Sequence, residues 1–437
     1  MTLPHAGSNV IERMNADCLC LSLDAGALSA AFASELGDAA FAARLLADAP
    51  GLISRQPVFL SAGHAARMAA VIRAIEDVAT LPAYRAHVLA HAPPIARFDP
   101  GPIGVFMGYD FHLGPDGPRL IEINTNAGGA LINAYLASAQ TACCRDVAHL
   151  LPGPAGLKDV TDGFAAAFGK EWSRQGRAGS PSSIAIVDDE PAKQFLHPEF
   201  QLFQKLFERH GMTAVIADPR ELAHQDGAML HAGRKIDLVY NRLTDFALGG
   251  AGREALRAAY LAGDAVVTPN PRAHALLADK RNLIALTDAE LLRGWGAPAE
   301  TISVLQSGIA MTQAVSREKA GALWAAREKL FFKPGAGFGS RAAYRGGKLT
   351  RKVWEAILEA GGYVAQELVQ PSRRGVKVDG QRRDMKVDLR NYTYDGAVQL
   401  MAARVYEGQT TNMRTAGGGF APVLAGDVDM QVDCGCA

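Results

Sequence analysis

In the first part of the chain, hydrophobic and polar positions alternate with the period of an α-helix. Up to about residue 100, apolar residues recur at helical spacing with few β-branched residues, which predicts helices over Ala27–Leu46 and Ala65–Ala92. The pair Pro93-Pro94 ends this part, because a proline pair cannot continue a helix. The N-terminal stretch is therefore expected to be helical.

Alternating residues follow on both sides of a turn. The runs Gly104–Leu113 and Arg119–Asn124 flank the turn residues Gly114–Gly117, which predicts a β-hairpin. A helix is expected over Ala130–Leu150, ended by Pro152-Gly153-Pro154.

A polar linker, Gly176–Ser183, precedes a change to alternating strands and helices. The expected strands are Ile184–Val187, Thr213–Ile216, Ile236–Tyr240 and Ala265–Thr268, and the expected helices are Glu199–His210 and Arg253–Leu261. This alternation predicts a parallel βα layer. Beyond Lys329 the pattern is again one of strands, at Leu330–Lys333, Tyr363–Gln366, Met385–Tyr394 and Val398–Tyr406.

Composition narrows the class of protein. The 437 residues are enough for about three packed units of roughly 150 residues. Lys plus Arg and Asp plus Glu number 45 each, so no basic field exists to hold a nucleic acid or an anionic membrane. No apolar run approaches membrane-spanning length, and the first ten residues lack the pattern of a leader peptide. A cytoplasmic protein is the default expectation.

The six cysteines occur as three close pairs, Cys18/Cys20, Cys143/Cys144 and Cys434/Cys436. These spacings are too tight for an ordinary disulfide within a pair, and six cysteines are too few for a secreted framework of this length. We expect them to be reduced. A soft metal at Asp433–Cys436 is the less favoured alternative to a plain tail, since zinc requires four ligands.

The turn of the hairpin sets its register. If the turn is centred on Pro115–Gly117, Asp110 lies opposite Glu122, and the period of two along a strand puts Asn124 on the face of Glu122. Two carboxylates that face each other repel unless a cation lies between them, and hard oxygen ligands favour Mg²⁺. The sequence predicts a magnesium site here; the alternative is a solvated polar strand face.

A glycine-spaced loop follows Lys333, in Pro334–Ser340. Glycines let backbone N–H groups approach phosphate oxygens, and the lysine adds a positive charge. Further on, the strand that carries Glu367 leads into an apolar segment whose backbone can read an adenine edge. The pattern predicts nucleotide binding. A plain hairpin loop followed by an exposed glutamate would have the same sequence pattern and is the alternative.

Three other basic side chains are candidates for ligand binding because of their positions in the sequence. Lys280 opens a predicted helix and by itself is typical of a surface residue. Arg242 follows a strand of the βα layer, where open α/β sheets bind ligands, and suits a substrate carboxylate. Arg414 lies beside the run Gly417–Gly419, either as a clamp for phosphate and carboxylate groups or as an ordinary loop arginine.

Together and in this order, these pieces resemble the ATP-grasp ligases, specifically the circularly permuted, eukaryotic-type glutathione synthetases. The resemblance spans about Val105–Val423, and Glu122-Ile-Asn124 is similar to the family's metal-binding strand, which comes early in the permuted type. It implies an α/β (α+β overall), circularly permuted ATP-grasp fold with an inserted parallel βα domain. The implied domains are 1–180, with the helical region and metal-binding hairpin; 181–275, the βα substrate-binding domain; and 276–437, the lid and ATP-binding core.

The resemblance also implies a role for each matched residue. Mg²⁺ is expected at Asp110, Glu122 and Asn124. The residues expected to bind ATP are Lys280, Lys333, Gly335, Gly337, Gly339, Gln366, Glu367, Val369 and Asp388. The residues expected at the substrates are Arg242, Arg414, Gly418 and Gly419, with Lys333 and Arg414 as the catalytic cations.

Three positions depart from the family pattern. Gly337 stands where the family has a metal-binding glutamate, Gly108 replaces an arginine used near the peptide substrate, and Ala416 replaces a lysine. These departures concern a second metal and the substrates more than ATP. Glutathione synthesis itself is therefore not the inference that the sequence supports.

The implied activity is that of an ATP-dependent carboxylate–amine ligase, which forms an amide or peptide bond through an acyl phosphate and releases ADP and phosphate. The implied partners are a small carboxylate and an amine, of amino-acid or peptide type, with no nucleic acid or membrane; a homodimer is left open. A small-molecule kinase, or a degenerate nucleotide-binding ATP-grasp protein, is the alternative.

Overall fold

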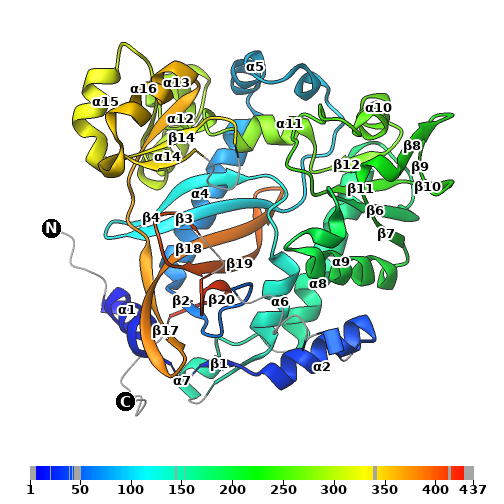
Figure 1. Cartoon of the computed structure of the whole chain (residues 1–437), viewed down its shortest axis with the longest axis horizontal. Helices are drawn as coiled ribbons and strands as arrows, with labels where there is room; N and C mark the ends of the chain where they lie inside the picture. Colours follow the sequence, from blue (N-terminus) through cyan, green and yellow to red (C-terminus); the bar gives the residue numbers. More distant parts are fainter. Residues whose placement is uncertain are drawn as a thin grey trace.

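A computed structural model of the chain describes residues 6–19, 21–38, 40–41, 43, 51–142, 145–152, 154–337, 342–411 and 415–427. These residues form three adjoining parts, each built on a sheet (Figure 1). A long antiparallel sheet occupies the middle, a parallel sheet with its helices lies on the right, and a smaller sheet with helices lies at the upper left. The mixed α/β class expected from the sequence is confirmed.

The central sheet has seven strands, in the order β2-β20-β19-β18-β3-β4, with β17 paired to β18. They are β2 (Val58–Leu60), β3 (Met107–Gly114), β4 (Gly117–Asn124), β17 (Ser372–Val378), β18 (Gln381–Tyr394), β19 (Ala397–Tyr406) and β20 (Gly419–Ala425). All pairs are antiparallel except β2 with β20. The chain thus enters this sheet early, through the predicted hairpin, and again near its end.

Helices cover both faces of the central sheet. On one face lie α4 (Ala62–Thr80) and α14 (Ala299–Gly308), and on the other lie α6 (Ala130–Ser138) and α8 (Pro154–Arg174). Because side chains alternate along a strand, Phe111 and Leu389 enter the first layer, while Tyr392 and Tyr394 enter the second. The sheet is therefore fixed from both sides.

The right-hand part contains the predicted parallel layer, in the order β12-β11-β6-β7. Its elements are β6 (Ser183–Val187), α9 (His197–Arg209), β7 (Thr213–Ala217), β11 (Leu238–Asn241), α10 (Glu254–Ala262) and β12 (Val266–Thr268). Every strand pair is parallel, as expected.

This part also contains a small antiparallel sheet that the sequence pattern did not predict, made of β8 (Leu222–Gln225), β9 (Ala228–His231) and β10 (Arg234–Ile236). The single strand expected over Ile236–Tyr240 is consequently divided at Asp237. The Asp237 carboxylate accepts hydrogen bonds from the Ser182 N–H at 2.9 Å and the Ser182 hydroxyl at 2.6 Å. These contacts tie the break to the end of the linker.

The upper-left part, called the lid below, carries the sheet β13-β16-β14-β15. Its elements are α12 (Asn282–Leu286), α13 (Ala289–Gly294), β13 (Thr312–Ala314), α15 (Ala320–Ala326), β14 (Leu330–Pro334), β15 (Tyr344–Arg345), α16 (Arg351–Ala360) and β16 (Tyr363–Glu367). Phe332 packs with Trp354 in the lid core. Alternation along β14 therefore turns the next residue, Lys333, to the opposite face.

The remaining elements are α1 (Ala6–Asp17), β1 (Ser22–Leu23), α2 (Ala25–Leu36), α5 (Pro82–Ala90), β5 (Gln140–Thr141), α7 (Arg145–Ala148) and α11 (Pro271–Ala273). The helix expected over Ala27–Leu46 instead ends at Leu36, because Gly37 adopts a left-handed φ of 66° and its N–H bonds to Ala33. Residues 40, 41 and 43 are helical again, and residues 39, 42 and 44–46 lie outside the described part.

Two other helix predictions were too long. The helix expected over Ala65–Ala92 is divided at Leu81, since Pro82 disfavours the helical conformation in the residue before it. The helix expected over Ala130–Leu150 ends at Ser138, and the chain then forms β5, which pairs with β1. The pairing of β5 with β1, which lies far away in the sequence, therefore ends the helix at Ser138.

Candidate active site

The central hairpin has the predicted register. Asp110 pairs with Glu122, and Gly108 pairs with Asn124. A bulge between these pairs and the turn places one extra residue, Ile121, on β4 and leaves β3 regular. The alternation along β3 therefore continues, so that His112 shares the face of Asp110.

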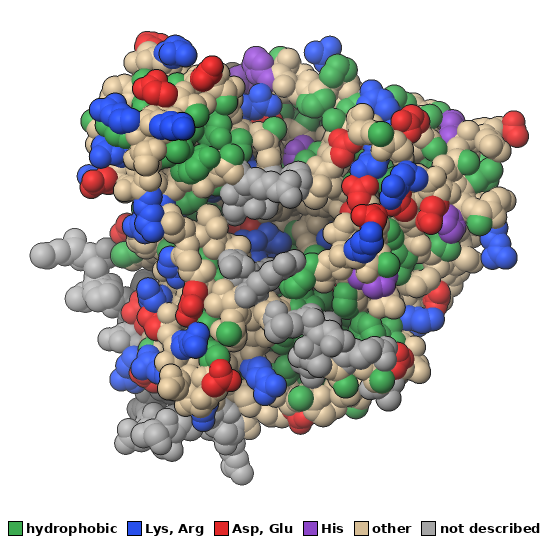
Figure 2. Space-filling model, in the orientation of Figure 1, with side chains coloured by type: hydrophobic (Ala, Val, Ile, Leu, Met, Phe, Trp, Pro, Cys, Tyr) green, Lys and Arg blue, Asp and Glu red, His purple; other side chains and the backbone are tan. Residues whose placement is uncertain are grey.

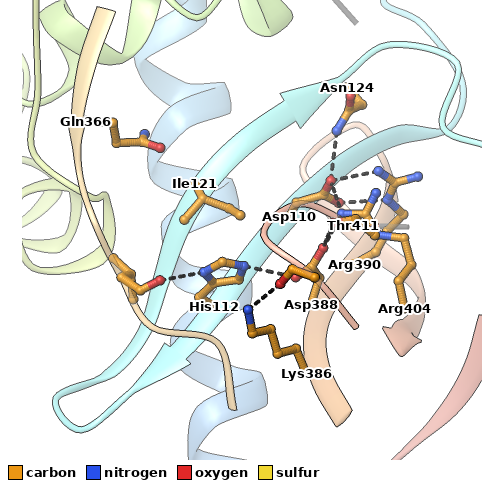
Figure 3. Close-up of polar contacts among 12 residues, drawn as sticks. Asp110, His112, Ile121, Asn124, Gln366, Lys386, Asp388, Arg390, Arg404 and Thr411 are labelled. Atoms are coloured by element: carbon orange, nitrogen blue, oxygen red, sulfur yellow. Dashed lines mark hydrogen bonds and ion pairs between the residues drawn. The ribbon is translucent and has the colours of Figure 1, made fainter. Parts of the chain in front are cut away.

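Asp110 is a buried carboxylate held by four donors (Figure 3). Arg390 donates from Nε to Oδ1 and from Nη2 to Oδ2, both at 2.7 Å. Arg404 Nη2 donates to Oδ2 at 2.7 Å, and Asn124 Nδ2 does so at 2.9 Å. Two guanidinium groups thus supply the positive charge that this carboxylate requires. The geometry does not support Asp110 as a direct magnesium ligand, whereas Asn124 keeps its Oδ1 for another partner.

Glu122 faces two lysines. Lys280 Nζ lies 3.3 Å from Glu122 Oε1, and Lys333 is close enough to influence its titration. Burial opposes ionisation of Glu122, but Lys280 and then Lys333 hold its pKa below the usual range. Burial likewise lowers the pKa of Lys333, an effect that Glu122 offsets and Lys280 reinforces. The two lysines and the carboxylate form one electrostatic unit.

Both lysines are buried and held by backbone or amide oxygens. Lys280 Nζ donates to the backbone oxygen of Gly337 at 2.8 Å, which ties it to the glycine loop. Lys333 Nζ donates to the backbone oxygen of Ile121 at 3.1 Å and to Gln366 Oε1 at 2.9 Å. Burying two ammonium groups is costly unless anions compensate them. One glutamate neutralises only one of the two charges, so the site favours an anionic guest.

The segment after β16 connects the lid to the central sheet. Glu367 caps this strand end, and its carboxylate accepts from Arg119 at 3.0 Å while its N–H bonds to the Met311 oxygen at 2.8 Å. Its side chain is half exposed. Two residues later, the backbone oxygen of Val369 accepts from His112 Nδ1 at 2.7 Å. The predicted adenine-binding segment is thus anchored on both of its flanks.

Asp388 collects further donors. His112 Nε2 lies 2.9 Å from Oδ1, Arg404 Nη2 lies 3.0 Å from Oδ2, and the Thr411 hydroxyl also donates to Oδ2. Burial opposes ionisation, but Arg404 and the hydrogen bond from His112 hold the pKa of Asp388 well below its usual range. Asp388 is therefore an ionised carboxylate that joins His112, Arg404 and Thr411 by hydrogen bonds.

A cavity of about 700 Å³, partly open to solvent, joins these groups. Its lining residues come from the hairpin, the lid sheet and the strand ends of the central sheet: His112, Ile121, Glu122, Lys280, Phe331, Lys333, Pro334, Gly337, Ala343, Gln366, Glu367, Leu368, Val369, Tyr406, Gln409, Thr410 and Thr411. Leu368 and Val369 are among its apolar lining residues, and Lys280 and Lys333 are its lysines.

The predicted ATP residues are thus brought together, with three qualifications. Gly335 does not line the cavity, although its backbone oxygen accepts from the Lys280 N–H at 3.1 Å. Asp388 reaches the site only through hydrogen bonds, and Gly339 lies outside the described residues. Three important residues were missed: His112, Arg390 and Arg404. His112 had a signal, its spacing of two from Asp110, whereas the arginines lie 280 and 294 positions beyond Asp110.

Arg242 lies where predicted, directly after β11, but it is buried. Its Nη1 donates to the backbone oxygen of Asn126 at 2.5 Å and to the Tyr240 hydroxyl at 3.2 Å. Its guanidinium also lies over the ring of Phe200. Its Nε is buried without a partner in the described part of the chain, which leaves one donor for a ligand. A substrate role remains a prediction.

The glycine run is part of the fold. Gly418 and Gly419 are buried, and Gly419 begins β20. A Cβ at Gly419 would lie 2.5 Å from backbone atoms of Leu52 and Ile53. Gly419 therefore lies directly against the Leu52–Ile53 backbone, where a larger residue would not fit. Arg414 and the cysteines other than Cys18 lie outside the described residues.

Comparison with known proteins supports the fold. Neither a protein-family model nor a curated protein matches the chain. Among solved structures, a glutathione synthetase-like effector from Globodera pallida, in its apo form, superposes with a TM-score of 0.55 at 12% identity, covering 91% of this chain and 97% of the effector. The chain therefore has the fold of this glutathione synthetase-like protein, as the resemblance in the sequence implied.

Two further likenesses are weaker. A candidate gamma-glutamylcysteine synthetase from Methylobacillus flagellatus KT gives a TM-score of 0.47 at 10% identity, over 85% of this chain and 90% of the other. The ATP-grasp ligase PsnB with a minimal precursor gives 0.31 at 15% identity, over 57% and 91%. Among the described helices, none is long and apolar enough to cross a membrane.

Proposed function

We propose that this chain is an ATP-dependent carboxylate–amine ligase that forms an amide or peptide bond through an acyl phosphate. The observation that carries the proposal is the pair of buried lysines, Lys280 and Lys333, that face one glutamate in a single cavity. A triphosphate supplies the negative charge that these cations lack. The adenine would lie against Gln366–Val369, which line the same cavity.

The residues present also fit a magnesium ion. Glu122 lines the cavity and is held ionised, and Asn124 keeps its Oδ1 for a ligand because Asp110 accepts from its Nδ2. Two oxygen ligands with room for phosphate oxygens and water suit Mg²⁺. When bound, the ion would offset charge on the phosphates. Among the described residues, no group of three or more His, Cys, Asp or Glu side chains could hold a metal ion, so phosphate oxygens and water would have to supply the remaining ligands.

The proposed chemistry requires no side-chain nucleophile. A substrate carboxylate attacks the γ-phosphorus, the bond to the β-phosphate oxygen breaks, and ADP leaves. The amine nitrogen then attacks the acyl carbon, the carbon–oxygen bond to phosphate breaks, and the amine loses a proton to the released phosphate or water. Lys280 and Lys333 stabilise the charge that develops on the transferred phosphoryl group. Arg242, Gly418, Gly419 and Arg414 are the proposed substrate positions.

An ADP-release screen tests the proposal. Purified protein with Mg-ATP is offered small carboxylates, amino acids and peptides, singly and in carboxylate–amine pairs. A ligase releases ADP at a substantial rate only with a pair, whereas a kinase releases it with one acceptor. Release that no amine stimulates would establish the kinase alternative instead.

Two substitutions assign that activity to this cavity. Glu122→Ala and Lys333→Met should each abolish Mg²⁺-dependent turnover while circular dichroism shows an unchanged fold. The matched control is Lys158→Met, which removes a lysine that is 75% exposed on α8. Wild-type turnover in the Glu122 variant, or equal loss in the Lys158 control, would contradict the assignment.

A further inference from the structure

A continuous chain of hydrogen bonds crosses the site, from the nucleotide hinge to the metal motif (Figure 3). In order, its members are Val369, His112, Asp388, Arg404, Asp110 and Asn124. The successive links measure 2.7, 2.9, 3.0, 2.7 and 2.9 Å. The two ends are the groups proposed for adenine and for Mg²⁺.

Each link has a fixed direction. The Val369 carbonyl and the ionised Asp388 carboxylate can only accept, so both ring nitrogens of His112 donate. Arg404 Nη2 donates at once to Asp388 and Asp110. Except at Val369, every link ends on a carboxylate oxygen, and charge-assisted bonds are roughly twice as strong as neutral ones. Both carboxylates are only 1% exposed, so water competes little for them.

His112 is the member that joins separate parts of the molecule. Val369 lies between β16 of the lid and β17 of the central sheet, whereas Asp388 lies inside the central sheet on β18. The imidazole lines the cavity and spans the two with donors at opposite edges of a rigid ring. Glutamine or asparagine offers a donor at only one atom, and phenylalanine offers none. Histidine therefore holds both acceptors in a way that neither amides nor phenylalanine can.

We propose that His112 is a positioning residue that couples the nucleotide hinge to the metal site. By holding Val369 and Asp388 together, it fixes Arg404 between two carboxylates. Asp110 in turn accepts from Asn124 Nδ2, which leaves Asn124 Oδ1 as the atom that would bind the ion. Occupancy of the hinge by adenine and binding of Mg²⁺ therefore favour the same arrangement. This inference rests on the proposed function and adds a role for a residue outside the predicted site.

Calorimetry with a non-hydrolysable ATP analogue, adenylyl imidodiphosphate, measures this coupling without the unidentified substrates. The dissociation constant of the analogue is determined without and with Mg²⁺. The first value divided by the second is called the magnesium factor. His112→Phe keeps a ring and removes both bonds, and His112→Gln keeps one bond. We expect the magnesium factor to fall about fivefold or more in both variants, because the coupling is lost. A purely structural role of the ring would change affinity but not this ratio.

The control is Ile121→Val, which alters the lining of the same cavity but lies outside the chain of bonds. It should weaken binding equally with and without Mg²⁺. Asn124→Ala should lower the magnesium factor, and adding His112→Phe to it should lower the factor no further, since independent distant sites would add. An unchanged factor in both His112 variants, or full additivity with Asn124→Ala, overturns the inference. Absence of any analogue binding by the wild type instead refutes the proposed nucleotide site itself.

Discussion

The substitution Asp110→Asn tests the role of Asp110. We infer that this carboxylate orients two arginines and does not bind the metal directly. The substitution keeps the shape and removes the charge. Asp110 accepts three hydrogen bonds from Arg390 and Arg404 and one from Asn124. An asparagine amide has one acceptor oxygen, and its NH₂ group would face donors. Breaking a buried ion pair on one side costs about 3–5 kcal/mol, because the partner charge is left buried. We expect a loss of that size in the apparent free energy of unfolding.

The matched control is Asp384→Asn on β18. Asp384 pairs with Arg373 at 2.8 Å, but the two side chains are 51% and 55% exposed. An exposed pair contributes about 0–1 kcal/mol, so this variant should unfold close to the wild type. Urea denaturation of the full chain, followed by circular dichroism, compares the three proteins directly.

The outcome distinguishes the two roles of Asp110. If Asp110→Asn were no more costly than Asp384→Asn, the two arginines would not depend on this carboxylate and the reasoning would fail. If stability were unchanged while the effect of Mg²⁺ on nucleotide affinity disappeared, Asp110 would act on the metal site alone, either as a ligand or through Asn124.

Three other predictions concern the neighbouring groups. Burial, partly offset by Arg242, raises the pKa of Asp188 from 3.8 to about 6, so its contribution to stability is present at low pH and is lost as the pH rises through about 6. Asp188→Asn should therefore be more stable than the wild type at pH 8 but not at pH 4, and equal differences in urea titrations at both pH values would contradict this. Arg242→Lys loses the planar fork, so it should raise the KM of the acid substrate with little effect on ATP affinity; loss of ATP binding would instead place Arg242 in the nucleotide site. Mg-ATP should raise the melting temperature by an amount that grows with the logarithm of its concentration, equivalent to about 2.7 kcal/mol at one hundred times the Kd, and no shift at saturation would exclude nucleotide binding.

The local sequence pattern was sufficient to predict those elements whose structure depends on neighbouring residues. The turn residues Gly114–Gly117 fixed the hairpin, and the register of Asp110 against Glu122 followed from counting outward. The βα layer could be predicted for the same reason, since each strand and helix shows its own period. Lys280 and Lys333 could be proposed as partners only through the resemblance, because no local rule links them.

Element ends were predicted less well where tertiary contacts set them. The helix that begins at Ala130 stops at Ser138 because the next residues pair with β1, more than one hundred positions earlier. The strand expected over Ile236–Tyr240 divides where Asp237 bonds to Ser182. Neither partner is visible in the local pattern.

The sequence by itself determined the hairpin, its two facing carboxylates and the order of the parts, because these depend on period, turn chemistry and spacing. Only the tertiary structure decided what compensates each carboxylate. Asp110 takes its counter-charges from Arg390 and Arg404, 280 and 294 positions away, since antiparallel pairing lays β18 beside β3 and β19 beside β18. Glu122, on the same hairpin, meets lysines from the lid instead. A buried charge must be neutralised by whatever group the fold brings within reach, and that group need not be near in the sequence.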